Sequence, residues 1–273
     1  MLHILRSEWK RCIEGKEFQV TSLLIFLISI AAFMIDAFYH YGSGANGLRS
    51  AAEMSIVQSV YSSFLLNIVV ATLPLFAALI YSDAFIRDLT NKVYPFTLTR
   101  IAVHRIVIAQ CIVIFSTTFT VYMVCFTINQ VLTLIAFPIE GVSNNFGFPT
   151  YDLAFQNYGP EFAFDLLRIQ SPYLYNFLYM FIISGFAGLF ALFTYAVLLF
   201  LKKWKLRVII GVFLGFTVLN IVLSMADLRH LRLTTLLHPV SIYPEYVIIY
   251  WAGCLIMMSG ILIYLGLKKK DFS

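Results

Sequence analysis

Charged residues are scarce in this chain of 273 residues, because Asp, Glu, Lys and Arg together make up 12% of it. A soluble domain usually carries about twice that share. Sequence motifs for common chemistry are missing as well: there is no GxxxxGK[ST] phosphate-binding loop, no HExxH zinc motif and no GxSxG nucleophile motif. These absences argue against an ordinary soluble protein and against ATP hydrolysis by this chain, so we expect it not to be an enzyme.

Cysteine is also rare, and the four cysteines are not arranged as a site. Cys12, Cys111, Cys125 and Cys254 lack the spacing of a metal-binding motif or of a redox pair. Three of them lie within apolar stretches, where cysteine behaves as a small hydrophobic residue. We therefore expect no disulfide, no metal and no cofactor in this chain.

Apolar residues are what the chain has in abundance, at 60% of the total, and they gather in six long stretches almost free of charge. About 20 apolar residues in a helix span a bilayer. In lipid, a helix satisfies its backbone groups within one segment. We predict an all-α integral membrane protein, with one domain of six transmembrane helices. The predicted spans are Phe18–Tyr39, Met54–Ser82, Ile106–Ile139, Gln170–Leu201, Val208–Ala226 and Tyr246–Leu267.

Basic residues are divided unevenly between the two sides of this predicted bundle. Six spans place both termini on one side, and only Arg49, Arg168, Arg229 and Arg232 lie on the other. Since basic residues accumulate in short cytoplasmic loops, we predict a multi-pass protein of the cell membrane, in a bacterial plasma membrane, with both termini cytoplasmic. The net charge of +5 then reflects topology and not nucleic-acid binding. The basic residues on the predicted cytoplasmic side are Arg6, Lys10, Arg11, Lys16, Arg87, Lys92, Arg100, Arg105, Lys202, Lys203, Lys205, Arg207, Lys268, Lys269 and Lys270.

Three segments outside the spans have a character of their own. Residues 1–17 place Leu2, Leu5, Trp9 and Ile13 at helical spacing among charges. This pattern predicts an amphipathic helix on the inner membrane face, with a frayed terminus as the alternative. On the outer side, residues 140–169 form the longest connection, either a functional loop or a plain extracellular cap. Residues 227–245 are partly apolar, which is compatible with a re-entrant course.

Asp36 is the one acidic residue within a predicted span. Ionisable groups inside a membrane often mark a transport pathway. Asp36 lies near the outer end of its span, where the cost of a charge is smaller than at the centre. The sequence leaves two readings open, an interfacial residue or a residue that lines a substrate path.

Between the second and third spans, the chain reads YSDAFIRDLTNKVYPFTLTR. Ser82 or Asp83 can cap a helix here, and Asp83 and Arg87 are spaced for an i,i+4 ion pair. We predict a short amphipathic helix over residues 83–94 on the cytoplasmic surface, or, alternatively, a solvated helix that only turns the chain around. Its apolar stripe would be Phe85, Ile86, Leu89 and Val93, and the side chains facing elsewhere would be Arg87, Asp88, Asn91 and Lys92.

This layout resembles the permease subunits of ABC-2 type transporters. In that family the loop between the second and third spans often carries an acidic–basic pair, a Gly-Thr-Leu helix and then Pro-x-Ser-Arg. Arg87–Asp88 is similar to the charged pair, and Leu98–Thr99–Arg100 is similar to the end of the motif. No Gly precedes Thr90, and no Pro lies two residues before Thr99.

The resemblance implies that residues 83–94 are a coupling helix, which docks on a separate cytoplasmic ATPase subunit. ATP and Mg would be bound by that partner, and the chain would form the path of an exporter together with a second permease copy or a related permease. Aromatic-rich spans suit an amphipathic or hydrophobic substrate such as a peptide, a lipid or a drug. Two other functions stay open, a non-transporting assembly or sensory subunit and a secondary carrier. The coupling residues implied are Phe85, Arg87, Asp88, Leu89, Lys92 and Arg100.

Overall fold

The computed structural model describes residues 2–42, 49–90, 103–139, 163–202, 205–239 and 245–268. All regular secondary structure in these ranges is helical. Six helices are long and apolar enough to cross a membrane, so the chain has the character of an all-α, multi-pass membrane protein. They are α2 (Lys16–His40), α3 with α4 (Ser63–Thr90), α6 (Val103–Ala136), α8 (Pro172–Leu201), α9 (Lys205–Met225) and α11 (Tyr246–Lys268).

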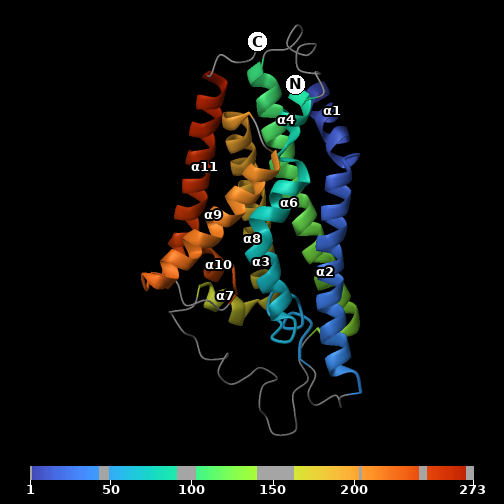
Figure 1. The fold of residues 1–273 in the computed structure, drawn as a ribbon. Helices are drawn as coiled ribbons and strands as arrows, with labels where there is room; N and C mark the ends of the chain where they lie inside the picture. Colours follow the sequence, from blue (N-terminus) through green and yellow to red (C-terminus); the bar gives the residue numbers. More distant parts are fainter. Residues whose placement is uncertain are drawn as a thin grey trace.

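The long helices form an elongated bundle, and the first described helix and the end of the last one lie at the same end of it. Figure 1 shows α1 (Leu2–Ile13) and the end of α11 at the top, on opposite sides of the bundle. We call this the terminal end and the opposite end the distal end. The short elements α7 (Asp165–Gln170), η3 (Arg229–Leu231) and α10 (Leu233–Leu236) lie toward the distal end.

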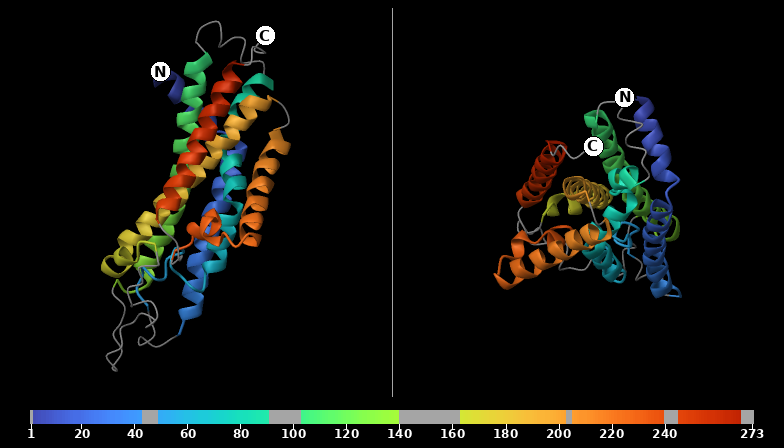
Figure 2. Two further views of the ribbon diagram at one scale, coloured as in Figure 1. Left: turned by 90° about the vertical axis from the view of Figure 1, so that its left-hand side faces the viewer. Right: turned by 45° about the horizontal axis from the view of Figure 1, so that its top comes forward.

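Helix α8 lies at the centre of the bundle. It packs against α3, α6 and α11, and the tilted view at the right of Figure 2 places it among them. Its apolar window is 67% buried, against 22% for α2 and α9 and 17% for α11. The outer helices therefore expose broad apolar faces, which suit contact with lipid or with a second membrane protein.

Two glycines let the neighbouring helices α6 and α11 approach α8 closely. A Cβ on Gly188 would lie 2.7 Å from the ring of Phe115 on α6, and one on Gly266 of α11 would lie 2.1 Å from the Leu199 side chain on α8. Small residues at such contacts let membrane helices pack backbone to backbone. The central packing of α8 thus depends on the absence of two side chains.

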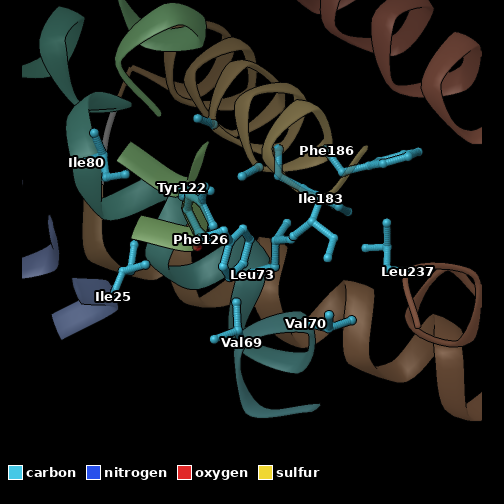
Figure 3. Close-up of a cluster of buried hydrophobic side chains, with 14 of the residues drawn as sticks. Ile25, Val69, Val70, Leu73, Ile80, Tyr122, Phe126, Ile183, Phe186 and Leu237 are labelled. Carbon is cyan, nitrogen blue, oxygen red and sulfur yellow. The ribbon is translucent and has the colours of Figure 1, made fainter. Parts of the chain in front are cut away.

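The apolar core joins all six long helices with α10 and the residue after it. Figure 3 shows Ile25 of α2, Leu73 of α3, Phe126 of α6 and Ile183 of α8 with Leu237 nearby. Leu233, Leu236 and Leu237 are at most 1% exposed. The apolar part of the connection 227–245 therefore packs into the bundle.

The second span begins later than predicted. Residues 49–62, which we call the distal segment, are not helical, and α3 begins at Ser63 instead of at Met54. The Ser55 hydroxyl accepts a hydrogen bond from the Val57 amide, at 3.2 Å. Serine side chains that bond nearby backbone in this way compete with helix formation, and an apolar count does not register that competition.

Although it is irregular, the distal segment is buried. Its Ile56 amide donates to Asn129 Oδ1 on α6 at 2.8 Å, and Asn176 Nδ2 on α8 donates to the Ala52 carbonyl at 2.8 Å. Irregular backbone at membrane depth is tolerated where protein groups satisfy it. The amides on α6 and α8 fulfil that requirement here.

Candidate functional site

The predicted coupling region lies at the terminal end of the bundle. Helix α4 (Ala84–Thr90) follows α3 (Ser63–Tyr81) after the pair Ser82–Asp83, and it packs against α6 and α8. Phe85 is fully buried and Asp88 is 4% exposed. The prediction that Asp88 faces away from the apolar stripe is therefore wrong. Phe85 and Asp88 are three residues apart, so they share the helix face that meets the bundle.

Asp88 is buried because polar groups from two other helices bind it. The Arg11 guanidinium of α1 forms an ion pair with its carboxylate, and Gln110 Nε2 of α6 donates to Asp88 Oδ2 at 2.9 Å. Arg11 also pairs with Glu8 at 3.0 Å. Buried carboxylates are stable when they are paired and hydrogen-bonded in this manner.

The contacts continue into the centre of the bundle. The Tyr195 hydroxyl of α8 donates to Gln110 Oε1 at 2.8 Å, and the Tyr81 hydroxyl of α3 donates to Glu8 at 2.8 Å. One set of hydrogen bonds therefore joins five helices, and we call it the terminal network. Its members are Glu8, Arg11, Tyr81, Asp88, Gln110 and Tyr195.

Two basic groups balance the two carboxylates of the terminal network. Burial disfavours the charge on Arg11, but hydrogen bonding and attraction from Asp88 together with the charge of Glu8 outweigh it, so the pKa of Arg11 is raised. The Arg87 guanidinium lies over the Tyr81 ring, 4.9 Å from its centroid, a cation–π contact. Arg87 Nη2 is buried and has no hydrogen-bond partner in the described structure. It is a donor available to an added acceptor.

A second group of charges ties α4 to the start of two further helices. Lys205 Nζ, at the start of α9, lies 2.8 Å from Asp83 Oδ2, and it also pairs with Glu17 at the start of α2. Asp83 therefore pairs with Lys205 and not with Arg87, contrary to the i,i+4 prediction. The partner from α9 is 122 positions away, which local spacing does not reveal.

Beside these charges lies a cavity of about 440 Å³, between α4 and the starts of α2 and α9. Ile86, Arg87 and Thr90 of α4 line it. Helix α4 thus has one face clamped into the bundle and another directed to an open charged cavity. Leu89 is partly buried against the core, and the predicted contacts Lys92 and Arg100 lie outside the described residues.

Asp36 lies far from this site, toward the distal end. It is fully buried, and its carboxylate accepts hydrogen bonds from the Ser59 hydroxyl at 2.5 Å and the Ser62 hydroxyl at 3.0 Å. Both serines belong to the distal segment. The carboxylate therefore holds a buried segment in place, and both readings from the sequence, an interfacial residue and a residue that lines a substrate path, stay predictions.

Sequence reasoning missed five members of the terminal network, namely Glu8, Arg11, Gln110, Tyr81 and Tyr195. A signal existed for the first three. Glu8 and Arg11 are spaced i,i+3 on the lead helix, and Gln110 is a polar residue within an apolar stretch. The Tyr195 contact has no such signal, since tyrosine is common throughout the spans.

The terminal network is suited to fixing helices in place, because its hydrogen bonds and ion pair join five helices. Among the described residues there is no group of three or more His, Cys, Asp or Glu side chains placed to hold a metal ion. Comparison of the chain with known protein families, with curated proteins and with solved structures gives no match. The function is therefore argued from the residues of the chain itself.

Proposed function

We propose that this chain is the permease subunit of an ATP-driven exporter, and that α4 is its coupling helix. A coupling helix has two requirements. It must be fixed to the spans, so that its motion moves them, and it must leave a surface free for a partner. The observation that carries the proposal is that α4 meets both, because Asp88 is clamped by Arg11 and Gln110 while Arg87 borders an open charged cavity.

The contacts suggest how motion would spread. A push on α4 moves Asp88, and the bond to Gln110 carries the displacement to α6. Gln110 is bonded in turn to Tyr195, so α8 follows. Since α8 is the most buried of the spanning helices, a shift at its terminal end would reorganise the whole bundle. ATP and Mg would be held by the separate ATPase.

An apolar groove supports a hydrophobic or amphipathic substrate. Its volume is about 540 Å³, and Trp9, Phe18, Phe26 and Val121 are among the residues that line it between α1, α2 and α6. Apolar pockets with few polar groups bind apolar ligands. The exposed faces of α2, α9 and α11 provide surface for a second permease copy or a related permease, in a membrane orientation with both termini cytoplasmic.

The test is affinity purification of the tagged full chain in mild detergent from its native membranes. Wild type is compared with Arg87→Glu, and with Arg6→Glu as control, because Arg6 is exposed on α1 at the same end. We expect a nucleotide-binding protein to co-purify with wild type and the control, and at least about ten-fold less with Arg87→Glu, since the loss of a central residue that carries binding energy costs about 2 kcal/mol or more.

The same experiment separates the alternative functions. If wild type brings no nucleotide-binding protein with it, even after crosslinking in membranes, the proposal is wrong. A partner without ATPase activity would indicate an assembly or sensory subunit instead.

A further inference from the structure

A cavity with both polar and apolar residues in its lining lies at the distal end, away from the terminal network. It has a volume of about 450 Å³ and lies between α3, α9 and the chain around α10. Figure 2 shows these elements side by side at that end of the bundle. Polar residues are concentrated in its lining, although two spanning helices form its walls. They are Asn67, Thr217, Asn220, Arg232, Thr234, Thr235 and His238.

Arg232 gives this cavity its charge. No carboxylate is among the described residues that line the cavity. Arg232 Nη1 is only 3.4 Å from the Ser224 hydroxyl, and Nε is buried without a hydrogen-bond partner in the described structure. A buried donor left unsatisfied is costly, and a guanidinium is always charged. The Arg232 Nε group therefore lacks an acceptor in the described structure, and an anion in the cavity would supply one.

The neighbouring polar groups are arranged around Arg232. Asn220 Nδ2 donates to the Phe216 carbonyl at 2.8 Å, and Asn220 Oδ1 accepts from the Thr234 hydroxyl at 3.1 Å. These bonds fix the segment that carries Arg232. In the described part of the chain, the Asn67 amide and the Thr235 hydroxyl have no such bond, so both are available to a ligand.

Burial lowers the pKa of His238, which keeps its imidazole neutral at pH 7. His238 therefore offers the cavity a neutral hydrogen-bonding group, and the positive charge stays on Arg232 alone. A single charge favours a monoanionic group over a multiply charged one.

The position of the cavity along the helices indicates which kind of molecule would carry the anionic group. Asn67 lies four residues from the distal end of α3 and Asn220 five from that of α9. At a rise of 1.5 Å per residue, these positions are about 6 and 7.5 Å inside the helix ends. The apolar face of an interfacial helix is buried to a similar depth, about 5–10 Å into the boundary between headgroups and acyl chains. Val70 and Phe216 line the cavity farther in.

We propose that this cavity binds a phosphate group, and that its apolar inner part makes a membrane phospholipid the carrier. Arg232 donates to the phosphate oxygens, since the guanidinium fork matches phosphate geometry. Asn67 and Thr235 add neutral hydrogen bonds, and an acyl chain lies along Val70 and Phe216. This inference does not depend on the proposed transport function, because a lipid site can exist in any membrane protein.

The test is native mass spectrometry of the delipidated full chain, titrated with phosphatidylglycerol. Diacylglycerol, which lacks the phosphate, and inorganic phosphate, which lacks the chains, are titrated in parallel. We expect one tightly held phosphatidylglycerol in wild type and at least about ten-fold weaker binding in Arg232→Gln, the loss of a charge-assisted contact. Arg6→Gln is the control, since it removes an exposed arginine at the other end.

A second variant keeps the test decisive if Arg232→Gln folds poorly. Asn67 is exposed on α3, so Asn67→Leu keeps a membrane-compatible surface, and we expect about three-fold weaker binding. If wild type and both single variants, Arg232→Gln and Asn67→Leu, bind phosphatidylglycerol equally, the proposed phosphate site is wrong. It is also wrong if diacylglycerol binds as tightly as phosphatidylglycerol. Displacement of phosphatidylglycerol by inorganic phosphate at equal concentration would overturn the lipid as its carrier.

Discussion

Removal of the Asp88 carboxylate tests whether the terminal network holds α4 in place. Asp88→Ala removes the ion pair with Arg11 and the hydrogen bond from Gln110. Arg11 keeps its contact with Glu8, and its side chain is 32% exposed, so water compensates part of the loss. A hydrogen bond to a charged group is worth about 1.5–3 kcal/mol. With that partial exposure, we expect a loss of about 2 kcal/mol for the variant.

The measurement is hydrogen exchange of the α4 amides in the purified full chain. A loss of about 2 kcal/mol in local opening raises the open population, and therefore the exchange rate, about 30-fold. The matched control is Thr90→Ala. Thr90 is exposed on the same helix, and its hydroxyl only bonds the Ile86 carbonyl of α4 itself.

A paired substitution sharpens the result. Replacing both partners of a buried polar pair by apolar residues is often close to neutral, whereas removing one partner is not. Arg11→Met with Asp88→Leu should therefore recover most of the protection that Asp88→Ala loses. If Asp88→Ala exchanges within two-fold of wild type, the network does not hold α4, and the coupling route through Gln110 has no basis.

The remaining predictions concern packing, pH and topology. Gly188→Ala should lower the melting temperature in detergent, because overpacking against Phe115 costs about 1–3 kcal/mol. The control Gly185→Ala should not lower it, since nothing lies within 4 Å of the added Cβ. Equal melting temperatures of the two variants would contradict the close contact at Gly188. Burial raises the pKa of Glu53 above 4.5, so the folded state binds the proton more tightly than the unfolded state does. Protection of the distal segment from hydrogen exchange should therefore fall as the pH rises from about 4.5 through the raised pKa of the folded state. Glu53→Gln should abolish that dependence, and a variant that keeps it would assign the titration elsewhere. Reporter fusions near residues 45, 92, 155, 204 and 235 should alternate out, in, out, in and out, and a cytoplasmic signal at 155 would refute the topology.

The long helices could be predicted because their signal is additive. A stretch such as Tyr246–Leu267 is apolar throughout, and membrane-spanning length follows from composition alone. The start of the second span was placed wrongly, because the serines of the distal segment bond to backbone and to Asp36. Such bonds depend on geometry that a count of apolar residues does not contain.

The face of α4 could not be predicted for a different reason. A helical stripe shows which residues share a side, but it does not show which partner that side meets. Asp88 and Arg11 are 77 positions apart, and their contact exists only after α1 folds against α6. Asp83 likewise pairs with Lys205 across the chain. In a membrane protein, charged residues lie where their helices leave the apolar layer. Residues at the same depth can therefore form ion pairs even when they are far apart in the sequence.

The distal segment also has a consequence for the order of biogenesis. Its buried backbone is bonded by Asn129 and Asn176, which leave the ribosome long after residues 49–62. Until α6 and α8 have entered the membrane, these backbone groups must remain bonded to water or to the insertion machinery. The distal segment is therefore synthesised early but adopts its final structure late. A nascent chain that ends before Asn176 should leave this segment open to protease, although three spanning helices, α2, α3 with α4, and α6, would already be complete.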